Sequence, residues 1–323
     1  MFRYVRLKPG EVSSHRLANT LQSVVLFGGM LLFLALIGYL LSGLGGVVWA
    51  LGLGLLSFAF SKQVAPLLVL RLYRARVLTA QTAPELYDLV DRLAERAELE
   101  AAPTLFYVPS AMLNAFALMY RGAPIIGVTD GLLRSLSGRE LAGVLAHEIG
   151  HIRNQDLTVM GLADAISRLT HSFSVVGQIM LLVSLPLYWV SDAPVPWLTI
   201  VLLMAAPTFN SLLQLALSRT REFDADLEAV RLTGDPEGYV SALQKIEYQG
   251  AGFLERIFFP GRREPSPSLL RTHPETGERI ARIRSMVEVC SPRLSLRDIV
   301  DWLPVRLARV QRPPGRRWGG MWY

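Results

Sequence analysis

Long uncharged stretches constrain the fold of this chain more than any other feature of its sequence. Residues 17–41 contain no charged side chain, and residues 44–60 form a second apolar stretch after only Ser42 and Gly43. Each is close to the ~20 residues that a helix needs to cross a hydrocarbon core of about 30 Å, the second at the short end. Since two residues permit only a tight hairpin, the sequence predicts two consecutive membrane-spanning helices, at about 18–41 and 44–60.

Two further apolar stretches lie at 173–190 and 195–217, with residues 191–194 between them. Polar interruptions such as Asn210 and Gln214 are of a kind that neighbouring helices satisfy within a membrane bundle. A buried pair of soluble helices is the alternative for this hairpin, but 51% hydrophobic residues and a mean hydropathy of +0.33 favour the membrane. The predicted fold class is a mostly α-helical integral membrane protein with four transmembrane helices in two hairpins.

Basic residues lie at the outer ends of both hairpins, whereas neither hairpin tip contains lysine or arginine. They precede the first span, follow the second, precede the third and follow the fourth (Arg3, Arg6, Lys8 and Arg16; Lys62, Arg71, Arg74 and Arg76; Arg168; Arg219 and Arg221). Positive charges tend to stay on the cytoplasmic side. We therefore expect a multi-pass protein of the cytoplasmic (inner) membrane, with both termini and the segment between the hairpins in the cytoplasm.

The net charge of +6 fits contact with the anionic headgroups of a lipid bilayer. A nucleic-acid partner is not expected, because the sequence has no basic groove interleaved with aromatic residues. The single cysteine, Cys290, excludes an intrachain disulfide bond and suits a reducing compartment.

One pentapeptide, His-Glu-Ile-Gly-His, points to chemistry. It follows Ser137 and Glu140, a capping-box pair that predicts the start of a helix. On a helix, His147 and His151 lie one turn apart on one face, where both imidazoles can bind the same zinc ion. Glu148 then stands beside the open coordination position as a general base. The alternative is an amphipathic helix that carries two histidines by chance.

A zinc enzyme needs a third protein ligand, with water in the fourth position. A metzincin would need glycine at 154 and histidine at 157, where this chain has asparagine and leucine. A thermolysin-type site wants a glutamate about twenty residues downstream, but residues 157–217 contain none. Asp164 and His171 are the only substitutes near the motif.

Glu222 and Asp226, just after the fourth apolar stretch, are the better candidates. They are four residues apart and therefore share a helix face. Glu222 can supply the third ligand, and Asp226 can accept a hydrogen bond from a ligand histidine and so fix its tautomer. A solvated acidic patch on a helix that leaves the membrane is the alternative.

The string HEIGH, a transmembrane hairpin, the string REFDAD and a late Thr-His-Pro segment together resemble the HtpX-type heat-shock membrane metalloproteases, relatives of the CaaX prenyl proteases. The resemblance covers most of the chain. It implies a cytoplasmic gluzincin-like protease domain with one Zn²⁺ per chain. The ligands would be His147, His151 and Glu222, with Glu148 as the base and Asp226 bound to a ligand histidine.

Two further segments resemble parts of the same family. Asn114, Ala115 and Phe116 correspond to an edge strand on which an extended substrate lies, and strand addition would give binding that tolerates many sequences. A plain core strand is the alternative. His273 lies in a segment that the family places near the cleft, where it either stabilises the oxyanion or only caps its helix. The basic loop at 260–267 and the aromatic tail have no counterpart that we can identify in the family.

The predicted organisation has five parts. They are an N-terminal segment with the first hairpin (1–61), the first part of the protease domain with the HExxH helix (62–172), the second hairpin (173–217), the second part of the protease domain (218–290) and a basic, aromatic tail (291–323). Strand-like segments at 104–108, 114–120 and 124–129 predict a small antiparallel sheet in the first part of the protease domain, at 62–172.

The predicted function is a zinc metalloendopeptidase that cleaves misfolded or damaged membrane proteins on the cytoplasmic side, in quality control and the stress response. One alternative is CaaX-type processing of prenylated peptides, although that branch is associated with more than four spans. The other is a zinc-stabilised membrane adaptor without catalysis, against which Glu148 argues, because a structural site needs no base.

Overall fold

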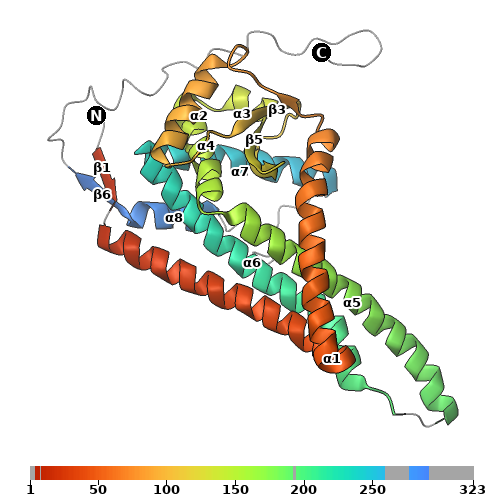
Figure 1. Cartoon of the computed structure of the whole chain (residues 1–323). Coiled ribbons are helices and arrows are strands. Elements are labelled where there is room, and N and C mark those ends of the chain that lie inside the picture. The colour runs from red at the N-terminus through yellow and green to blue at the C-terminus, as the bar shows by residue number, and fades with distance from the viewer. Residues whose placement is uncertain (1–3, 8, 192–193, 259–275, 291–323) are drawn as a thin grey trace, which may run out of the picture.

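The computed structural model describes residues 4–7, 9–191, 194–258 and 276–290, and shows a helical stem below a domain built around a small sheet (Figure 1). The stem consists of α1 (Pro9–Leu72) together with the longer parts of α5 (Asp156–Ser191) and α6 (Trp197–Thr233). The other elements are β1 (Tyr4–Leu7), β2 (Arg76–Val77), α2 (Pro84–Arg96), β3 (Thr104–Val108), β4 (Ala115–Tyr120), β5 (Ala123–Thr129), α3 (Asp130–Ser135), α4 (Gly138–Arg153), α7 (Pro236–Phe258), α8 (Thr276–Ser285) and β6 (Val287–Cys290).

The helix α1 reverses direction at the two residues predicted as a hairpin turn. Ser42 and Gly43 leave the helical conformation, and Gly43 has a φ of +60°, which glycine adopts without strain. The two arms approach closely beside the turn, since a Cβ on Gly46 would lie 1.9 Å from the carbonyl oxygen of Gly38. Only glycine at these positions permits the tight reversal seen in Figure 1.

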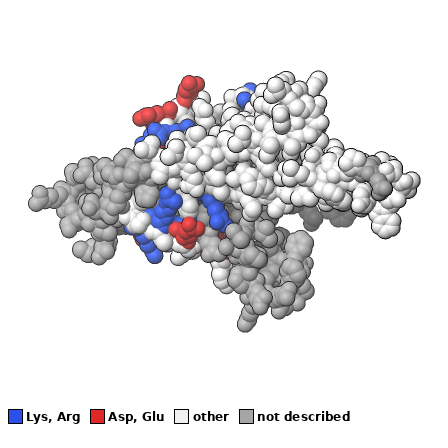
Figure 2. All heavy atoms as spheres, turned by 90° about the horizontal axis from the view of Figure 1, so that it is seen from below, with Lys and Arg blue, Asp and Glu red and all other residues white. Residues whose placement is uncertain are grey.

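Three described helical segments are long and apolar enough to cross a membrane, namely Leu17–Lys62 of α1, together with α5 and α6. Their large apolar side chains point outward, with Leu32 73%, Leu44 78% and Val190 88% exposed. Seen from below in Figure 2, the projecting end formed by α5 and α6 shows no charged side chain among the residues that the structure describes. Since so much exposed apolar surface is unfavourable in water, the stem suits a lipid environment.

The stem helices continue into the upper domain without a break. The helix α5 begins at Asp156, well before the apolar stretch predicted at 173–190, and α6 continues to Thr233, well beyond residue 217. The apolar pattern therefore located the outward-facing part of each helix but not its ends. The division into parts at residues 61, 172 and 217 falls within helices and stays a prediction.

The small sheet is mixed, and the prediction of an antiparallel sheet was wrong for one strand pair. The strand order is β2-β3-β5-β4, in which β3 and β5 are parallel and the other two pairs are antiparallel. The strand β5 takes an inner place because its continuous apolar run, from Ile125 to Val128, is buried on both faces. The loop between β3 and β4 therefore passes over the end of β5, and β4 becomes an edge strand.

The helix α4 occupies the centre of the upper domain. Its capping box is formed as predicted, because Ser137 and Glu140 each bond the other's backbone or side chain. Leu141, Leu145 and Ile149 are fully buried in a core shared with α2, α7 and the sheet. This core fixes the helix, so that its opposite side faces α6.

A two-stranded ribbon and a polar link hold α8 to the base of the domain. The strands β1 and β6 pair antiparallel, with Tyr4 opposite Cys290. Asn19 of α1 donates a hydrogen bond to Asp224 of α6 at 2.6 Å and accepts one from Arg282 of α8 at 3.1 Å. Segments from both ends of the chain are thereby joined beside α6 (Figure 1).

Candidate active site

The structure brings together three residues that sequence reasoning selected from two distant motifs. His147 and His151 of α4 and Glu222 of α6 form a cluster whose potential ligand atoms all lie within 4.8 Å of one another. The two Nε2 atoms are 3.2 Å apart, and the carboxylate oxygens of Glu222 lie 3.5 Å from Nε2 of His147 and 3.7 Å from Nε2 of His151. Ligands about 2.0–2.1 Å from a tetrahedral zinc ion are separated by roughly 3.3 Å, so this donor set fits such an ion.

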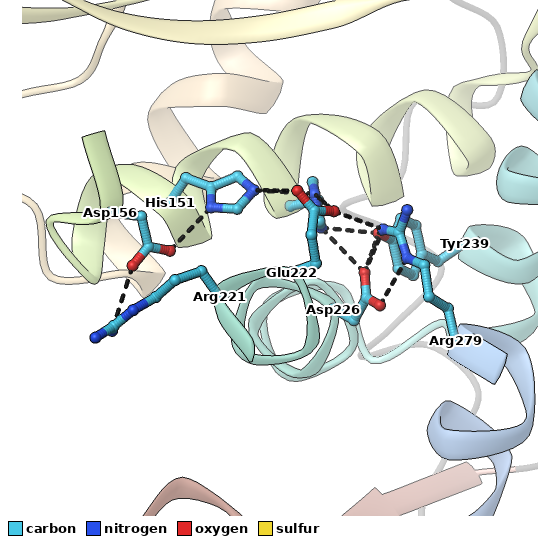
Figure 3. Close-up of polar contacts among 8 residues, drawn as sticks. His151, Asp156, Arg221, Glu222, Asp226, Tyr239 and Arg279 are labelled. Carbon is cyan, nitrogen blue, oxygen red and sulfur yellow. Dashed lines mark hydrogen bonds and ion pairs between the residues drawn. The ribbon is translucent and has the colours of Figure 1, made fainter. Parts of the chain in front are cut away.

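Close approach of α4 and α6 makes the cluster possible. Gly150, inside the HExxH string, faces α6, where an added Cβ would meet the Cβ of Glu228 at 3.0 Å and Cα of Ala225 at 3.4 Å. A larger residue would push the helices apart. About one turn before Ala225 in α6, Glu222 points towards His151 in Figure 3, and its carboxylate lies near Nε2 of both histidines.

Glu148 directly follows His147 in α4 and is also largely buried. It is 9% exposed, compared with 7% for His147 and 5% for Glu222. Within the described part of the chain, its carboxylate makes no hydrogen bond or ion pair. A buried carboxylate without a partner, one residue from a histidine of the candidate metal site, is available to take up a proton.

The imidazole of His151 is held from behind by a residue that sequence reasoning did not select. Its Nδ1 lies 2.9 Å from Oδ2 of Asp156, the first residue of α5. Asp156 is 1% exposed, and its other oxygen lies 3.4 Å from Nη1 of Arg221. An aspartate directly after the HExxH helix was the available signal, but only the turn between α4 and α5 shows that it folds back.

The imidazole of His147 is held by a larger network from α6, α7 and α8 (Figure 3). Its Nδ1 lies 2.8 Å from the hydroxyl of Tyr239 and 3.2 Å from Oδ1 of Asp226. Arg279 donates to both oxygens of Asp226, at 2.8 and 2.5 Å, and to the hydroxyl of Tyr239 at 2.8 Å. Asp226 lies beside His147, as the sequence led us to expect, whereas Tyr239 and Arg279 were missed because they are distant in sequence and carry no motif of their own.

The surroundings of His147 favour a positive charge. Burial alone would lower its pKa, since a buried imidazolium loses its hydration, but hydrogen bonds with Asp226 and Glu222 outweigh burial and raise the pKa to about 10. Arg279 acts in the opposite direction. The carboxylates that favour a proton here would equally favour a metal cation.

The two alternative third ligands are not part of this cluster. Asp164 accepts a hydrogen bond from Gln214 of α6, and His171 is exposed on α5. Both belong to the stem side of α5, away from the turn that brings Asp156 to His151.

The segment predicted to bind substrate lies at the edge of the sheet. Asn114 is exposed, Ala115 and Phe116 begin β4, and β4 packs against α4. The ring of Phe116 covers Gly127 of β5, where a Cβ would meet it at 2.5 Å, and lies 6.1 Å from the ring of Tyr73. His273, the loop at 260–267 and the tail at 291–323 lie outside the described residues.

Two histidines of an HExxH helix and a glutamate from a later helix, on top of an apolar helical stem, define a membrane-associated metallopeptidase of the HExxH class. The sequence profile of Peptidase family M48 matches residues 80–287, which is more than half of the chain. The chain belongs to peptidase family M48.

Relatives named Protease HtpX homolog match nearly their whole length. The chain is 35% identical over 303 residues to the protein of Acaryochloris marina, and the matched region covers 86% of this chain and 98% of the relative. The protein of Desulfatibacillum aliphaticivorans is 31% identical over 291 residues, with 83% and 89% covered. That of Pyrococcus abyssi is 35% identical over 269 residues, with 77% and 90% covered. The chain is thus a membrane metalloprotease, with a His-His-Glu cluster suited to a metal ion.

Among solved structures, the chain is similar to Ste24p from S. mikatae. The two share 17% identity and a TM-score of 0.49, with 84% of this chain and 66% of the other covered.

Proposed function

We propose that this protein is a zinc-dependent endopeptidase that cleaves misfolded or damaged membrane proteins on the cytoplasmic side of the inner membrane. The observation that carries the proposal is the arrangement of His147, His151 and Glu222, with Glu148, whose carboxylate has no partner among the described residues, directly after His147 in α4. A structural zinc site would close its fourth position with another ligand, whereas a hydrolytic site needs a base there.

The residues of this chain account for the proton transfers of peptide hydrolysis. When bound by His147, His151 and Glu222, zinc would lower the pKa of water to about 7 and polarise a carbonyl group. Glu148 takes the proton of the attacking water and later passes it to the leaving amine. His273 would share the negative charge that develops on the carbonyl oxygen.

The edge strand β4 is proposed to hold the substrate. An extended peptide can add to a sheet edge through backbone hydrogen bonds, which impose little sequence preference. The edge position of β4 and its packing against α4 support this role for Asn114, Ala115 and Phe116. Binding through the backbone suits clients that have only an unfolded segment in common.

The proposed topology has four membrane crossings, with both termini and the active site in the cytoplasm. The reversal of α1 at Ser42 and Gly43 supports two crossings within that helix, and α5 and α6 would supply the others. The basic residues at the outer ends of the hairpins support the orientation. Substrate segments would then reach the site directly from the inner surface of the bilayer.

The proposal is tested with the full chain in detergent, purified with chelator and then supplied with Zn²⁺. An unfolded membrane-protein reporter should be cleaved only after zinc is added. Glu148→Gln should keep zinc but lose about 10²–10⁴-fold in turnover, because the general base is removed. Glu95→Gln, an exposed glutamate of α2, is the matched control and should cleave like the wild type.

Equal cleavage by Glu148→Gln and the wild type would overturn the mechanism. Zinc and reporter binding by both proteins without cleavage by either would instead indicate the adaptor. In proteoliposomes, the reporter should be cut when its unfolded segment lies on the side of Arg168 and Arg219, and cleavage from the other side only would contradict the topology.

A further inference from the structure

Tyr239 of α7 connects His147 with the Asp226–Arg279 pair, and nothing in the HExxH or REFDAD strings requires it. We propose that Tyr239 is a positioning residue that holds His147 in the tautomer able to bind a metal ion through Nε2. The inference rests on the zinc site proposed above. It adds a polar relay, the hydrogen-bonded chain of Arg279, Asp226 and Tyr239, which determines the nitrogen of His147 that carries the proton.

The position of Tyr239 is fixed by packing. Its side chain is 1% exposed and lies against α4 where Gly143 leaves room, since a Cβ on Gly143 would meet Cβ of Tyr239 at 2.9 Å. Its ring is stacked against that of His147, with the ring centroids 5.8 Å apart. The hydroxyl has three partners, Nδ1 of His147 at 2.8 Å, Oδ1 of Asp226 at 2.7 Å and Nη2 of Arg279 at 2.8 Å.

The chemistry of these partners determines the direction of every hydrogen bond. A phenol has one proton to donate, an ionised carboxylate only accepts, and a guanidinium only donates. The two hydrogen bonds from Arg279 keep Asp226 ionised, so the hydroxyl of Tyr239 must give its proton to Asp226. The phenol oxygen can then only accept from Arg279 and from His147.

His147 therefore keeps its proton on Nδ1, so that Nε2, which faces Glu222 and His151, is the nitrogen that gives up its proton when a metal ion binds. This nitrogen lies 3.5 Å from Oε2 of Glu222 and 3.2 Å from Nε2 of His151. His151 reaches the same state more simply, because Asp156 accepts directly from its Nδ1 at 2.9 Å. The two ligand histidines thus depend on different partners, and only His147 depends on a group that can both donate and accept.

Because of this difference, the effect of one substitution on zinc binding should depend on whether a second one is present. In Asp226→Asn, the amide no longer demands the proton of Tyr239, which can then be donated to Nδ1 of His147. The imidazole would carry its proton on Nε2 and could not bind zinc there. Removing the hydroxyl as well, in Asp226→Asn with Tyr239→Phe, takes away the competing donor.

The experiment measures the zinc affinity of the full chain in detergent by competition with a chelator, for the wild type, both single variants and the double variant. Tyr239→Phe should bind about 10-fold more weakly, since Oδ1 of Asp226, at 3.2 Å, can replace the phenol as acceptor. Asp226→Asn should lose about 100-fold, and the double variant should recover to about the level of Tyr239→Phe. Tyr87→Phe, which removes a phenol bound to the carbonyl of Leu78 in another part of the domain, should bind like the wild type.

Recovery in the double variant distinguishes the relay from a packing role, because a packing defect would make the double variant at least as weak as the weaker single variant. That result would overturn the inference, as would wild-type affinity in Tyr239→Phe. The unfolding temperature of the metal-free proteins shows that all of them fold. A wild type without zinc affinity would overturn the proposed function together with this inference, whereas zinc binding with no recovery would overturn the inference alone.

Discussion

The two halves of α6, the lower one in the stem and the upper one in the domain above it, differ in the kinds of side chain that they expose and bury. In the lower half, large apolar residues face outward, with Leu198 69% and Leu212 50% exposed. In the upper half, the buried side chains include Glu222, Asp226 and Glu228, of which none is more than 5% exposed. A single continuous helix therefore passes from a part that exposes large apolar side chains to a part that buries charged ones.

The comparison shows what makes buried charge tolerable in this fold. Each buried carboxylate of the upper half faces a cation from another segment. Asp226 and Glu222 face Arg279 of α8, and Glu228 faces Arg153 of α4 as well as Arg231 of α6 itself. In the lower half, the buried polar contact is neutral, with Asn210 donating to Thr170 of α5 at 3.1 Å. The upper half should thus be sensitive to loss of a single partner, and the lower half should not.

The largest expected effect comes from Arg279→Leu. It leaves Asp226 buried without its main cation, which should lower the free energy of unfolding of the metal-free protein by about 3–5 kcal/mol. Arg284→Leu, on the same helix but 56% exposed in its pair with Glu237, should cost less than about 1 kcal/mol. Denaturant unfolding in detergent measures the change in the free energy of unfolding for both variants. Equal losses would contradict the distinction between buried and exposed charges.

The second effect concerns the closeness of α4 and α6. Gly150→Val should cost about 2–3 kcal/mol and weaken metal binding, because the side chain meets Glu228 and Ala225 and moves Glu222 away from the histidines. Gly52→Val in α1 is the control, since no atom lies within 4 Å of a Cβ there. Unchanged zinc affinity in Gly150→Val would show that helix contact does not set the ligand geometry.

A pH dependence tests another buried carboxylate of the upper domain. Burial raises the pKa of Glu140, but hydrogen bonds from Lys245, Ser241 and Ser137 outweigh burial and lower the pKa to about 2, from an ordinary 4.5. Because the folded-state pKa is the lower one, this stabilisation is complete above about pH 4.5 and is lost as the pH falls towards 2. Glu140→Gln should cost about 2 kcal/mol at pH 7, and a difference that persists unchanged near pH 2 would contradict the assignment.

The smallest effect is expected in the stem. Asn210→Leu should change stability by less than about 1 kcal/mol, because the hydroxyl of Thr170 keeps its hydrogen bond to the carbonyl of Ser167 and the new side chain is apolar. Unfolding of the protein in lipid nanodiscs measures it. A loss as large as that of Arg279→Leu would mean that the stem, too, depends on buried polar partners.

Local patterns predicted those parts of the molecule that depend on neighbours in sequence. The reversal of α1 at Ser42 and Gly43 followed from the length of the apolar stretches, and the start of α4 from Ser137 and Glu140. The grouping of Glu222 with the histidines came from helix spacing and the family resemblance together. The start of α5 could not be predicted, because an apolar pattern marks contact with lipid rather than helix length. The charged, helix-prone stretch after residue 217, by contrast, indicated that the last span continues as a helix to about residue 232.

Contacts between distant segments account for the rest. Tyr239 lies 92 residues from His147 in sequence, and its role depends on the packing of α7 against Gly143. Arg279 reaches Asp226 only because α8 lies beside α6. The order of the sheet depended on the burial of β5, and its unbroken apolar run from Ile125 to Val128 was a signal of an inner strand.

The central claim is that α4 and α6 together bind one zinc ion through His147, His151 and Glu222. X-ray absorption at the zinc edge, on the full chain loaded with one equivalent of zinc, tests it most directly. We expect two imidazole nitrogens at about 2.0–2.1 Å with the remaining ligands oxygen, and loss of this signal in Glu222→Ala. A sulfur ligand, or a spectrum that Glu222→Ala leaves unchanged, would contradict the claim.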